Sequence, residues 1–234
     1  MKYSFVDSRI SQEELANLEN VGIKPIKVPP SDLLYDAVCG HPDILITIID
    51  SNTIVVHRDM PYDFINLLKG AGFEVILSEN SLSSSYPGDV ILNAVNTEQF
   101  FMHSLKYTDT ALLNLVKNKK KLNINQGYSK CSTALVADNA VITSDKGIAD
   151  ELGKIGIDVL LLPPGDILLP GLDYGFIGGT CGLITKNKLA FFGDLNFYAY
   201  GQKVENFLRL HGVEPIFLRS GKLIDRGSLF TVDK

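Results

Sequence analysis

Residues that can do covalent chemistry gather in five short segments of this chain, each at the start of a predicted β-strand. The segments are residues 39–43, 87–89, 129–132, 178–182 and 225–228, and they hold all three cysteines, one of the four histidines and several acids. A thiolate is a nucleophile, an imidazole carries protons near neutral pH, and carboxylates hold a cation by charge-assisted hydrogen bonds. The pattern points to covalent chemistry on a small cation. The alternative is that the cysteines are only small core residues, because free cysteine is often buried.

The elements that position these segments repeat along the chain. Each unit is a hairpin of two apolar strands, an amphipathic helix and a third strand. Hairpins with turns that contain Asn or Asp are predicted within residues 44–57, 90–103, 132–143 and 182–192. Helix–strand pairs are predicted within residues 11–28, 59–77, 108–125, 145–162 and 202–218. A glycine suited to a left-handed backbone ends four of the helices, and Asn118 is predicted to take that role in the fifth.

The two ends of the chain predict how the array closes. Residues 228–232 lack a following strand and residues 2–6 lack a preceding one, so pairing them would complete a fifth hairpin and lock a ring. A closed ring leaves no sheet edge open to aggregation. Five units in 234 residues give about 47 residues each, a plausible repeat length, and we expect a single domain over residues 1–234.

This cyclic array of hairpin–helix–strand units resembles the pentein fold, a five-unit α/β propeller, of the guanidino-group-modifying enzymes. That superfamily includes amidinotransferases, arginine and agmatine deiminases and dimethylarginine dimethylaminohydrolases. The resemblance is one of architecture and covers nearly the whole chain, and we identify the chain as a branch of the superfamily. A ribosome anti-association factor has a related fivefold fold and is not an enzyme, so the fold by itself does not define the activity.

The resemblance implies a catalytic pair. In the superfamily a cysteine starts the first strand of one unit near the central axis, and a histidine starts the unit two earlier. Here Cys131 starts the third hairpin and His41 stands two units before it. The resemblance therefore implies that Cys131 is a nucleophile, preformed as a thiolate, and that His41 is the general acid and base. Cys181 is the rival nucleophile, although no histidine starts the unit two before it.

The resemblance also implies carboxylates that hold a planar cation. His41-Pro42-Asp43 is similar to the His-x-Asp arrangement of the superfamily, and other acids stand in loops that lead to the axis. The candidate substrate-binding residues are Asp43, Asp89, Asp166, Asp173 and Cys181. A Gly-Gly-Asp motif is missing one unit before His41, where Asp225-Arg226-Gly227 stands instead. Arg226 would repel a guanidinium unless an acid neutralises it.

Composition excludes several classes of function. The chain is 45% hydrophobic and 21% charged, with a net charge of −5, which is ordinary globular usage and disfavours nucleic acid as the main partner. No apolar run approaches the ~20 residues that span a bilayer, and no signal peptide is visible. An odd number of cysteines indicates a reducing cytoplasm. The glycines at 175–182 precede a strand and not a helix, so they are no dinucleotide fingerprint, and no organic cofactor is implied.

Two further readings of the central residues remain open. Cys39, His41, Cys131 and Cys181 have side chains that zinc accepts, but no close pair has the spacing of a structural zinc site, and we predict no metal. A ring-shaped protein that binds a ligand or a partner without catalysis competes nearly equally with the enzyme. The sequence predicts a cysteine-dependent hydrolase or transferase acting on a small guanidine or amidine compound, and it leaves the oligomeric state undefined.

Several acids and hydroxyls near helix starts have a simpler structural role. Asp59, Asp145 and Asp194 each precede a predicted helix and are expected to be N-caps. Ser11 with Glu14 matches a capping box.

Overall fold

The computed structural model describes all 234 residues and contains five separate three-stranded sheets. In each sheet the middle strand pairs antiparallel with one neighbour and parallel with the other. In spatial order the sheets are β15 (Phe230–Asp233), β1 (Lys2–Asp7) and β2 (Lys24–Val28); β3 (Ile46–Ile48), β4 (Thr53–Val56) and β5 (Glu74–Leu77); β6 (Val95–Asn96), β7 (Phe100–His103) and β8 (Lys120–Asn123); β9 (Thr133–Ala137), β10 (Ala140–Thr143) and β11 (Asp158–Leu161); β12 (Cys181–Thr185), β13 (Lys188–Phe191) and β14 (Glu214–Phe217). The mixed α/β architecture of repeated units is therefore confirmed.

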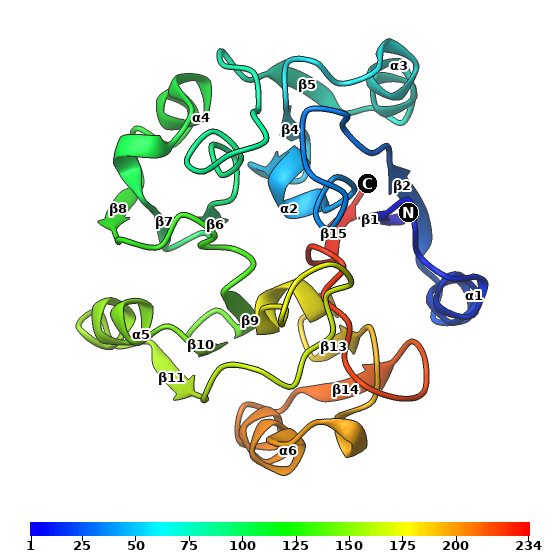
Figure 1. Ribbon diagram of the computed structural model, residues 1–234, viewed down its shortest axis with the longest axis vertical. Helices are drawn as coiled ribbons and strands as arrows, with labels where there is room; N and C mark the ends of the chain where they lie inside the picture. The colour runs from blue at the N-terminus through cyan, green and yellow to red at the C-terminus, as the bar shows by residue number, and fades with distance from the viewer.

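One helix of each unit lies on the outside of the molecule, and α2 lies near the centre (Figure 1). The outer helix crosses from the middle strand to the parallel strand of its sheet, as such connections usually do. The α-helices are α1 (Gln12–Asn20), α2 (Pro42–Leu45), α3 (Tyr62–Gly70), α4 (Thr110–Leu115), α5 (Lys146–Gly153) and α6 (Gly201–Leu210), and the 3₁₀-helices are η1 (Leu105–Tyr107), η2 (Ile177–Thr180) and η3 (Leu195–Phe197).

The helix ends agree with most of the sequence signals. Ser11 and Glu14 form the predicted capping box of α1, and Asp145 accepts a 2.9 Å hydrogen bond from the Ile148 amide at the start of α5. The prediction for Asp59 is wrong, because α3 starts later and Pro61 occupies its N-cap. Asp194 caps η3 and not α6, since the 3₁₀ turn comes between them.

The glycines after the helices take the predicted left-handed backbone. Their φ angles are +80° at Gly22, +87° at Gly72, +82° at Gly156 and +67° at Gly212. Asn118 does not share this role, since Asp166 and Ser228 are the only residues other than glycine with a positive φ. The physical reason is that α4 is six residues long and already ends at Leu115, so Asn118 lies in the turn before β8.

Two predicted first strands begin later than expected. Residues 44–45 belong to α2, because Pro42 at the first helical position favours a helical turn. In the next unit, residues 90–94 form turns and only Val95–Asn96 is a strand. In both places the chain near the centre of the molecule is irregular backbone, which is where side chains of the candidate site lie.

The first and last strands pair with each other, as predicted. β1 and β15 run antiparallel with Lys2 opposite Asp233 and Phe5 opposite Phe230. The two chain ends therefore lie side by side, and the N and C marks in Figure 1 are close together. The five sheets stay separate in their hydrogen bonding and do not join into one continuous sheet.

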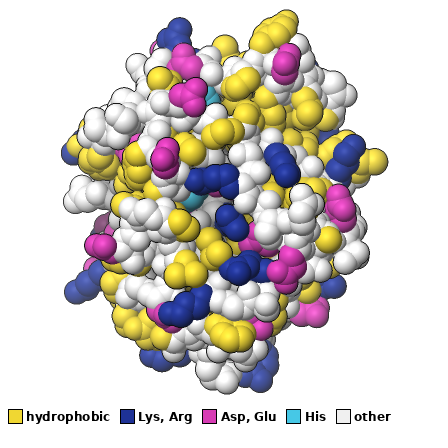
Figure 2. Space-filling model, turned by 45° about the vertical axis from the view of Figure 1, so that its right-hand side comes forward, with side chains coloured by type: hydrophobic (Ala, Val, Ile, Leu, Met, Phe, Trp, Pro, Cys, Tyr) yellow, Lys and Arg dark blue, Asp and Glu magenta, His cyan; other side chains and the backbone are white.

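Apolar residues of the strands and of the inner helix faces form the core. The largest cluster has 26 buried residues and joins the sheets of β1–β2 and β3–β5 to the segments around Leu92 and Leu112. On the face shown in Figure 2, lysines and arginines are interspersed with acids and apolar side chains. No helix has both the length and the apolar character needed to cross a membrane.

Candidate active site

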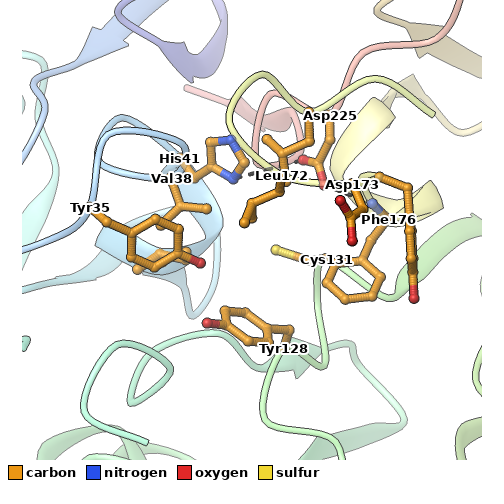
Figure 3. Close-up of a pocket in the computed structure, with 12 residues that line it drawn as sticks. Tyr35, Val38, His41, Tyr128, Cys131, Leu172, Asp173, Phe176 and Asp225 are labelled. Carbon is orange, nitrogen blue, oxygen red and sulfur yellow. Dashed lines mark hydrogen bonds and ion pairs between the residues drawn. The ribbon is translucent and has the colours of Figure 1, made fainter. Parts of the chain in front are cut away.

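A cavity of about 240 Å³ lies among the segments that precede the sheets near the centre of the molecule. Figure 3 shows Cys131 in the middle of this cavity, with His41 and Asp225 on one side and Tyr128 on another. The lining residues come from four parts of the chain: Tyr35, Val38, His41, Ile44, Tyr128, Cys131, Leu169, Leu172, Asp173, Tyr174, Phe176 and Asp225. The cavity thus unites residues that are far apart in sequence.

Cys131 stands in the turn that leads into β9, and its thiol is held by two neighbours. Its Sγ donates to Oδ1 of Asp43 at 3.0 Å and accepts from Nδ2 of Asn93 at 3.2 Å. The Asn93 Oδ1 in turn accepts from the backbone amide of Cys131 at 3.2 Å. The residue is only 2% exposed, although it lines the cavity. These contacts fix the thiol in one orientation at the cavity wall.

His41 is the N-cap residue of α2, and its ring faces the same cavity. The ring is buried, and neither of its nitrogens has a hydrogen-bond partner in the protein. Its Nδ1 lies 3.7 Å from Oδ1 of Asp225. One ring nitrogen of His41, a carboxylate oxygen of Asp43 and Sγ of Cys131 all lie within 4.8 Å of one another. An acid–base group therefore stands beside the thiol with its nitrogens free to bond a ligand.

Two buried carboxyl groups flank this pair. Asp43 accepts from Cys131 on Oδ1 and from the Ser228 hydroxyl on Oδ2 at 2.5 Å. Asp225 accepts from the backbone amides of Phe176 at 2.8 Å and Gly227 at 2.9 Å. Both carboxyl groups are at most 3% exposed. This concentration of negative charge favours a cation in the cavity.

Glycines let the backbone approach these acids closely, as expected for residues 178–182. A Cβ atom on Gly179 would lie 1.9 Å from the Asp225 carboxylate, and one on Gly178 would lie 2.4 Å from the Lys130 carbonyl oxygen. A Cβ on Gly227, whose φ is +70°, would lie 2.3 Å from the His41 Cβ. The three glycines therefore allow the last two units of the chain to close against His41 and Cys131.

The environment raises the pKa of the Cys131 thiol well above its usual value. Burial is the main cause, followed by the negative charges of Asp43 and Asp225. Burial likewise raises the pKa of Asp225, while His41 acts in the opposite direction. The expectation of a preformed thiolate is therefore corrected: in the free protein Cys131 is a protonated thiol that donates to Asp43.

The predicted substrate-binding acids lie at different depths. Asp43 contacts Cys131 directly, and the exposed Asp173 lines the mouth of the cavity. Asp89 is buried behind the cavity wall, where one of its carboxylate oxygens accepts a hydrogen bond from the Tyr128 hydroxyl. Burial and this bond raise the pKa of Tyr128, so Tyr128 stays a neutral donor. Asp89 therefore orients a wall residue and does not reach the cavity itself.

Two other predicted residues lie outside the cavity. Asp166 bonds the Lys222 ammonium at 2.6 Å and the Ala199 amide at 2.8 Å on the surface. Cys181 starts β12 and lines a second, separate cavity of about 690 Å³. Its pKa is raised to about 11, chiefly by burial. Neither residue touches the cavity that holds Cys131.

The sequence reasoning missed two residues of the site. Asn93 bonds Cys131 and Asp43, yet an asparagine after an apolar run carries no distinguishing signal in one sequence. Asp225 was noted only as a departure from Gly-Gly-Asp, although its position one unit before His41 is a usable signal. Arg226, expected to repel a cation, bonds Glu14 at 3.2 Å and does not line the cavity.

The ligand types of a metal site occur here in a different set from the one considered above. His41, Asp43 and Cys131 come together, whereas Cys39 and Cys181 do not join them. The donors would suit zinc. However, Cys131 and Asp43 already bond each other, and Asn93 and Ser228 donate to this pair. The local hydrogen bonds therefore satisfy the thiol and the Asp43 carboxylate without an ion.

Solved structures with the same fold are guanidino-group-modifying enzymes. The amidinotransferase SxtG of the saxitoxin pathway of Microseira wollei is 11% identical, with 92% of this chain and 87% of that chain covered and a TM-score of 0.58. Dimethylarginine dimethylaminohydrolase of Pseudomonas aeruginosa, solved with citrulline, is 8% identical, with coverages of 92% and 91% and a TM-score of 0.54. Agmatine deiminase of C. jejuni, solved with its substrate, is 13% identical, with coverages of 96% and 80% and a TM-score of 0.53.

These likenesses define the class of the protein by its fold. The chain has the fold of the pentein superfamily of guanidino-group-modifying enzymes, as the sequence resemblance predicted. More narrowly, residues 5–230 match a family of unknown function (DUF6873), and the chain belongs to that family. No curated protein matches the sequence.

Proposed function

We propose that the protein is a cysteine-dependent hydrolase or transferase that acts on a small guanidine or amidine compound. The observation that supports this most is the grouping of the Cys131 sulfur, a His41 ring nitrogen and an Asp43 carboxylate within 4.8 Å at a cavity. Asp225 adds a second carboxyl group beside His41. A nucleophile, an acid–base group and anchors for a cation are the parts that such a reaction needs.

The proposed reaction proceeds through a covalent adduct. The Cys131 thiolate attacks the central carbon of the cationic substrate, and a C–S bond forms. One C–N bond then breaks, and the departing amine takes a proton from His41. In hydrolysis, a water molecule attacks the adduct carbon, gives a proton to His41 and releases a urea or amide, and Cys131 regains its thiol. In transfer, an acceptor amine takes the place of water.

The raised pKa of Cys131 makes this reaction depend on the substrate. Negative charges at Asp43 and Asp225 oppose a thiolate in the free protein. A bound guanidinium or amidinium places a positive charge beside the sulfur, which favours the charged form of the thiol. His41 can take the thiol proton, because both of its ring nitrogens lack a partner in the protein. The nucleophile is therefore expected to form only when a cation occupies the cavity.

The test compares two alkylating reagents of the same shape. 2-Chloroacetamidine is cationic and 2-chloroacetamide is neutral, and both alkylate thiols. With Cys39 and Cys181 replaced by Ala, we expect Cys131 to react at least about tenfold faster with the amidine at pH 7, corresponding to about 1.4 kcal/mol. Peptide mass spectrometry locates the label, and Cys131→Ala is the control. Equal rates for both reagents would contradict the proposal. Screening guanidines for amine or urea release then identifies turnover.

The competing function is binding without catalysis. It is favoured by one observation, the 2% exposure of Cys131 together with its raised pKa. In that case guanidines bind the cavity, as a thermal shift would report, but neither reagent labels Cys131 and His41→Ala changes nothing in the labelling. An enzyme instead loses amine release in His41→Ala, because the leaving group has no proton donor.

We also propose that the five sheets act as one closed five-unit propeller, a single domain over residues 1–234. Pairing of β1 with β15 supports this closure. Its test belongs with the whole molecule and is given in the Discussion.

A further inference from the structure

The wall of the Cys131 cavity is apolar apart from its acids and His41. Eight of its residues are aliphatic or aromatic: Tyr35, Val38, Ile44, Tyr128, Leu169, Leu172, Tyr174 and Phe176. Tyr128 and Phe176 face each other with ring centroids 6.0 Å apart and an interplanar angle of 30°. Figure 3 shows these two rings on the side of Cys131 away from His41. A ligand that enters past them meets carbon on most sides.

The charges on the same wall all have one sign. Asp173 stands at the mouth and Asp225 lies deeper, while no lysine or arginine lines the cavity. The lysine next to Cys131 in sequence, Lys130, lines the other cavity. A carboxylate on a ligand would lose its water and meet two acids with no cation to pair with. A cation is stabilised here both by the acids and by the faces of the aromatic rings.

Resting on the proposed function, we infer that the substrate is a guanidine or amidine with a short apolar substituent and no carboxylate. The acids at the cavity floor hold the cationic head, and the aromatic and aliphatic wall holds the substituent. At about 240 Å³ the cavity is below the ~300 Å³ at which sites for drug-sized ligands begin, so the substituent is short. This excludes arginine and other guanidino acids as preferred ligands.

The experiment uses two ligands that differ mainly in one group. Butylguanidine and 4-guanidinobutyrate share a guanidine on a short alkyl chain, and only the second carries a carboxylate. Each is titrated as a protector of Cys131 against 2-chloroacetamidine at fixed ionic strength. We expect butylguanidine to protect at a concentration at least about tenfold lower, a difference near 1.4 kcal/mol. Equal protection, or better protection by the guanidino acid, overturns the inference.

Two variants test whether the cavity wall makes this choice. Asp173→Asn removes one acid at the mouth and is expected to narrow the difference between the two ligands. Leu172→Arg places a cation there and is expected to improve protection by 4-guanidinobutyrate. Asp138→Asn makes the same charge change at an exposed hairpin turn outside the cavity, and is expected to leave the difference unchanged. An unchanged difference in both cavity variants overturns the inference.

Failure of the proposed function is recognisable separately. If 2-chloroacetamidine and 2-chloroacetamide label Cys131 equally, covalent chemistry on amidines fails. The same two ligands are then compared by calorimetric titration of the unlabelled protein. Preference for butylguanidine upholds the inference about the ligand, and preference for the guanidino acid overturns it.

An independent observation concerns Lys130. Its side chain is buried, bonds the Ser228 hydroxyl at 2.9 Å and forms no ion pair. Ser228 donates to Oδ2 of Asp43, whose Oδ1 accepts from Cys131. A continuous chain of hydrogen bonds thus runs from the second cavity to the nucleophile. Ser228 has a φ of +68°, a conformation that is uncommon for serine and is often found at functional sites.

From this chain we infer that Lys130 is a positioning residue for the proposed nucleophile. Its ammonium holds the Ser228 hydroxyl so that the hydroxyl hydrogen points to Asp43, and Asp43 then orients the Cys131 thiol. The positive charge of Lys130 also offsets part of the negative charge around the sulfur. Loss of that charge therefore makes the thiol harder to ionise.

The test is the pH dependence of Cys131 alkylation by chloroacetamide. Lys130→Met is expected to move the midpoint to higher pH and to slow labelling at pH 8 at least about threefold. Lys130→Arg keeps the charge and is expected to stay closer to the unchanged protein. Ser228→Gly interrupts the same chain while suiting the positive φ, and serves if Lys130→Met does not fold. An unchanged midpoint in a folded variant overturns the role.

Discussion

At the scale of single residues, the sequence indicated the main members of the site but not their protonation. Cys131, His41 and Asp43 lie together as predicted, because strand starts from distant units converge at the centre. Whether they react stays a prediction. Asn93 and Asp225 could not be assigned from the sequence, since their roles come from hydrogen bonds to other units. The charge state of Cys131 was also beyond it, because burial and neighbouring acids set the pKa.

A residue outside the site predicts acid sensitivity. His57 is buried without a hydrogen-bond partner, and burial lowers its pKa to about 4 from 6.5. The unfolded chain thus binds a proton in the range where the native protein does not, so stability is lost as pH falls from 6.5 towards 4. The loss is about 3 kcal/mol at 1.36 kcal/mol for each unit.

His57→Leu is expected to reduce this acid sensitivity. Urea unfolding at pH 7 and pH 4.5 measures the difference in stability, which is expected to be smaller in the variant. His103, whose pKa burial also lowers to about 4, remains in both proteins and gives a common background. An equal loss in the two proteins would show that His57 does not titrate as described.

At the scale of elements, helices and parallel strands were the most predictable parts. Gly22, Gly72, Gly156 and Gly212 mark real helix ends, since a positive φ is required there. The first strands were less predictable. At Pro42 and at residues 90–94 the chain forms a helix and turns, because contacts with other units override the local apolar pattern.

Two aspartates that look alike in sequence make a matched pair of variants. Asp145 accepts a hydrogen bond from the Ile148 amide at the start of α5, whereas Asp59 caps no helix. We expect Asp145→Ala to lower the free energy of unfolding by about 1 kcal/mol and Asp59→Ala to change it by less than about 0.5 kcal/mol. Urea denaturation of both variants checks this. A similar loss in the two would contradict the cap assignment.

At the scale of the whole molecule, the pairing of β1 with β15 tests the proposed closure. Removing residues 228–234 leaves β1 without its antiparallel partner and takes Ser228 from Asp43. We expect the shortened chain to lose cooperative unfolding, as followed by circular dichroism in urea. Retention of a cooperative transition would show that the ring does not depend on this strand.

The adjacent chain ends provide the control. A circular permutant that joins Lys234 to Met1 by a short linker and opens the chain at the Asp138–Asn139 turn keeps β1 paired with β15. Because the new ends fall in an exposed turn, we expect it to fold and to label Cys131 like the original chain. A permutant that fails to fold would show that the order of the units along the chain matters more than their closure.

The side-by-side chain ends also determine how the protein responds to pulling. Lys2 lies opposite Asp233 in an antiparallel ladder, so tension on the two ends acts at the same end of the β1–β15 pair. The ladder then unzips one hydrogen-bonded pair at a time and does not shear as a whole. An optical trap should therefore open this seam at low force and release Ser228 from Asp43 early, which makes the proposed catalytic centre one of the first parts of the molecule to be lost under load.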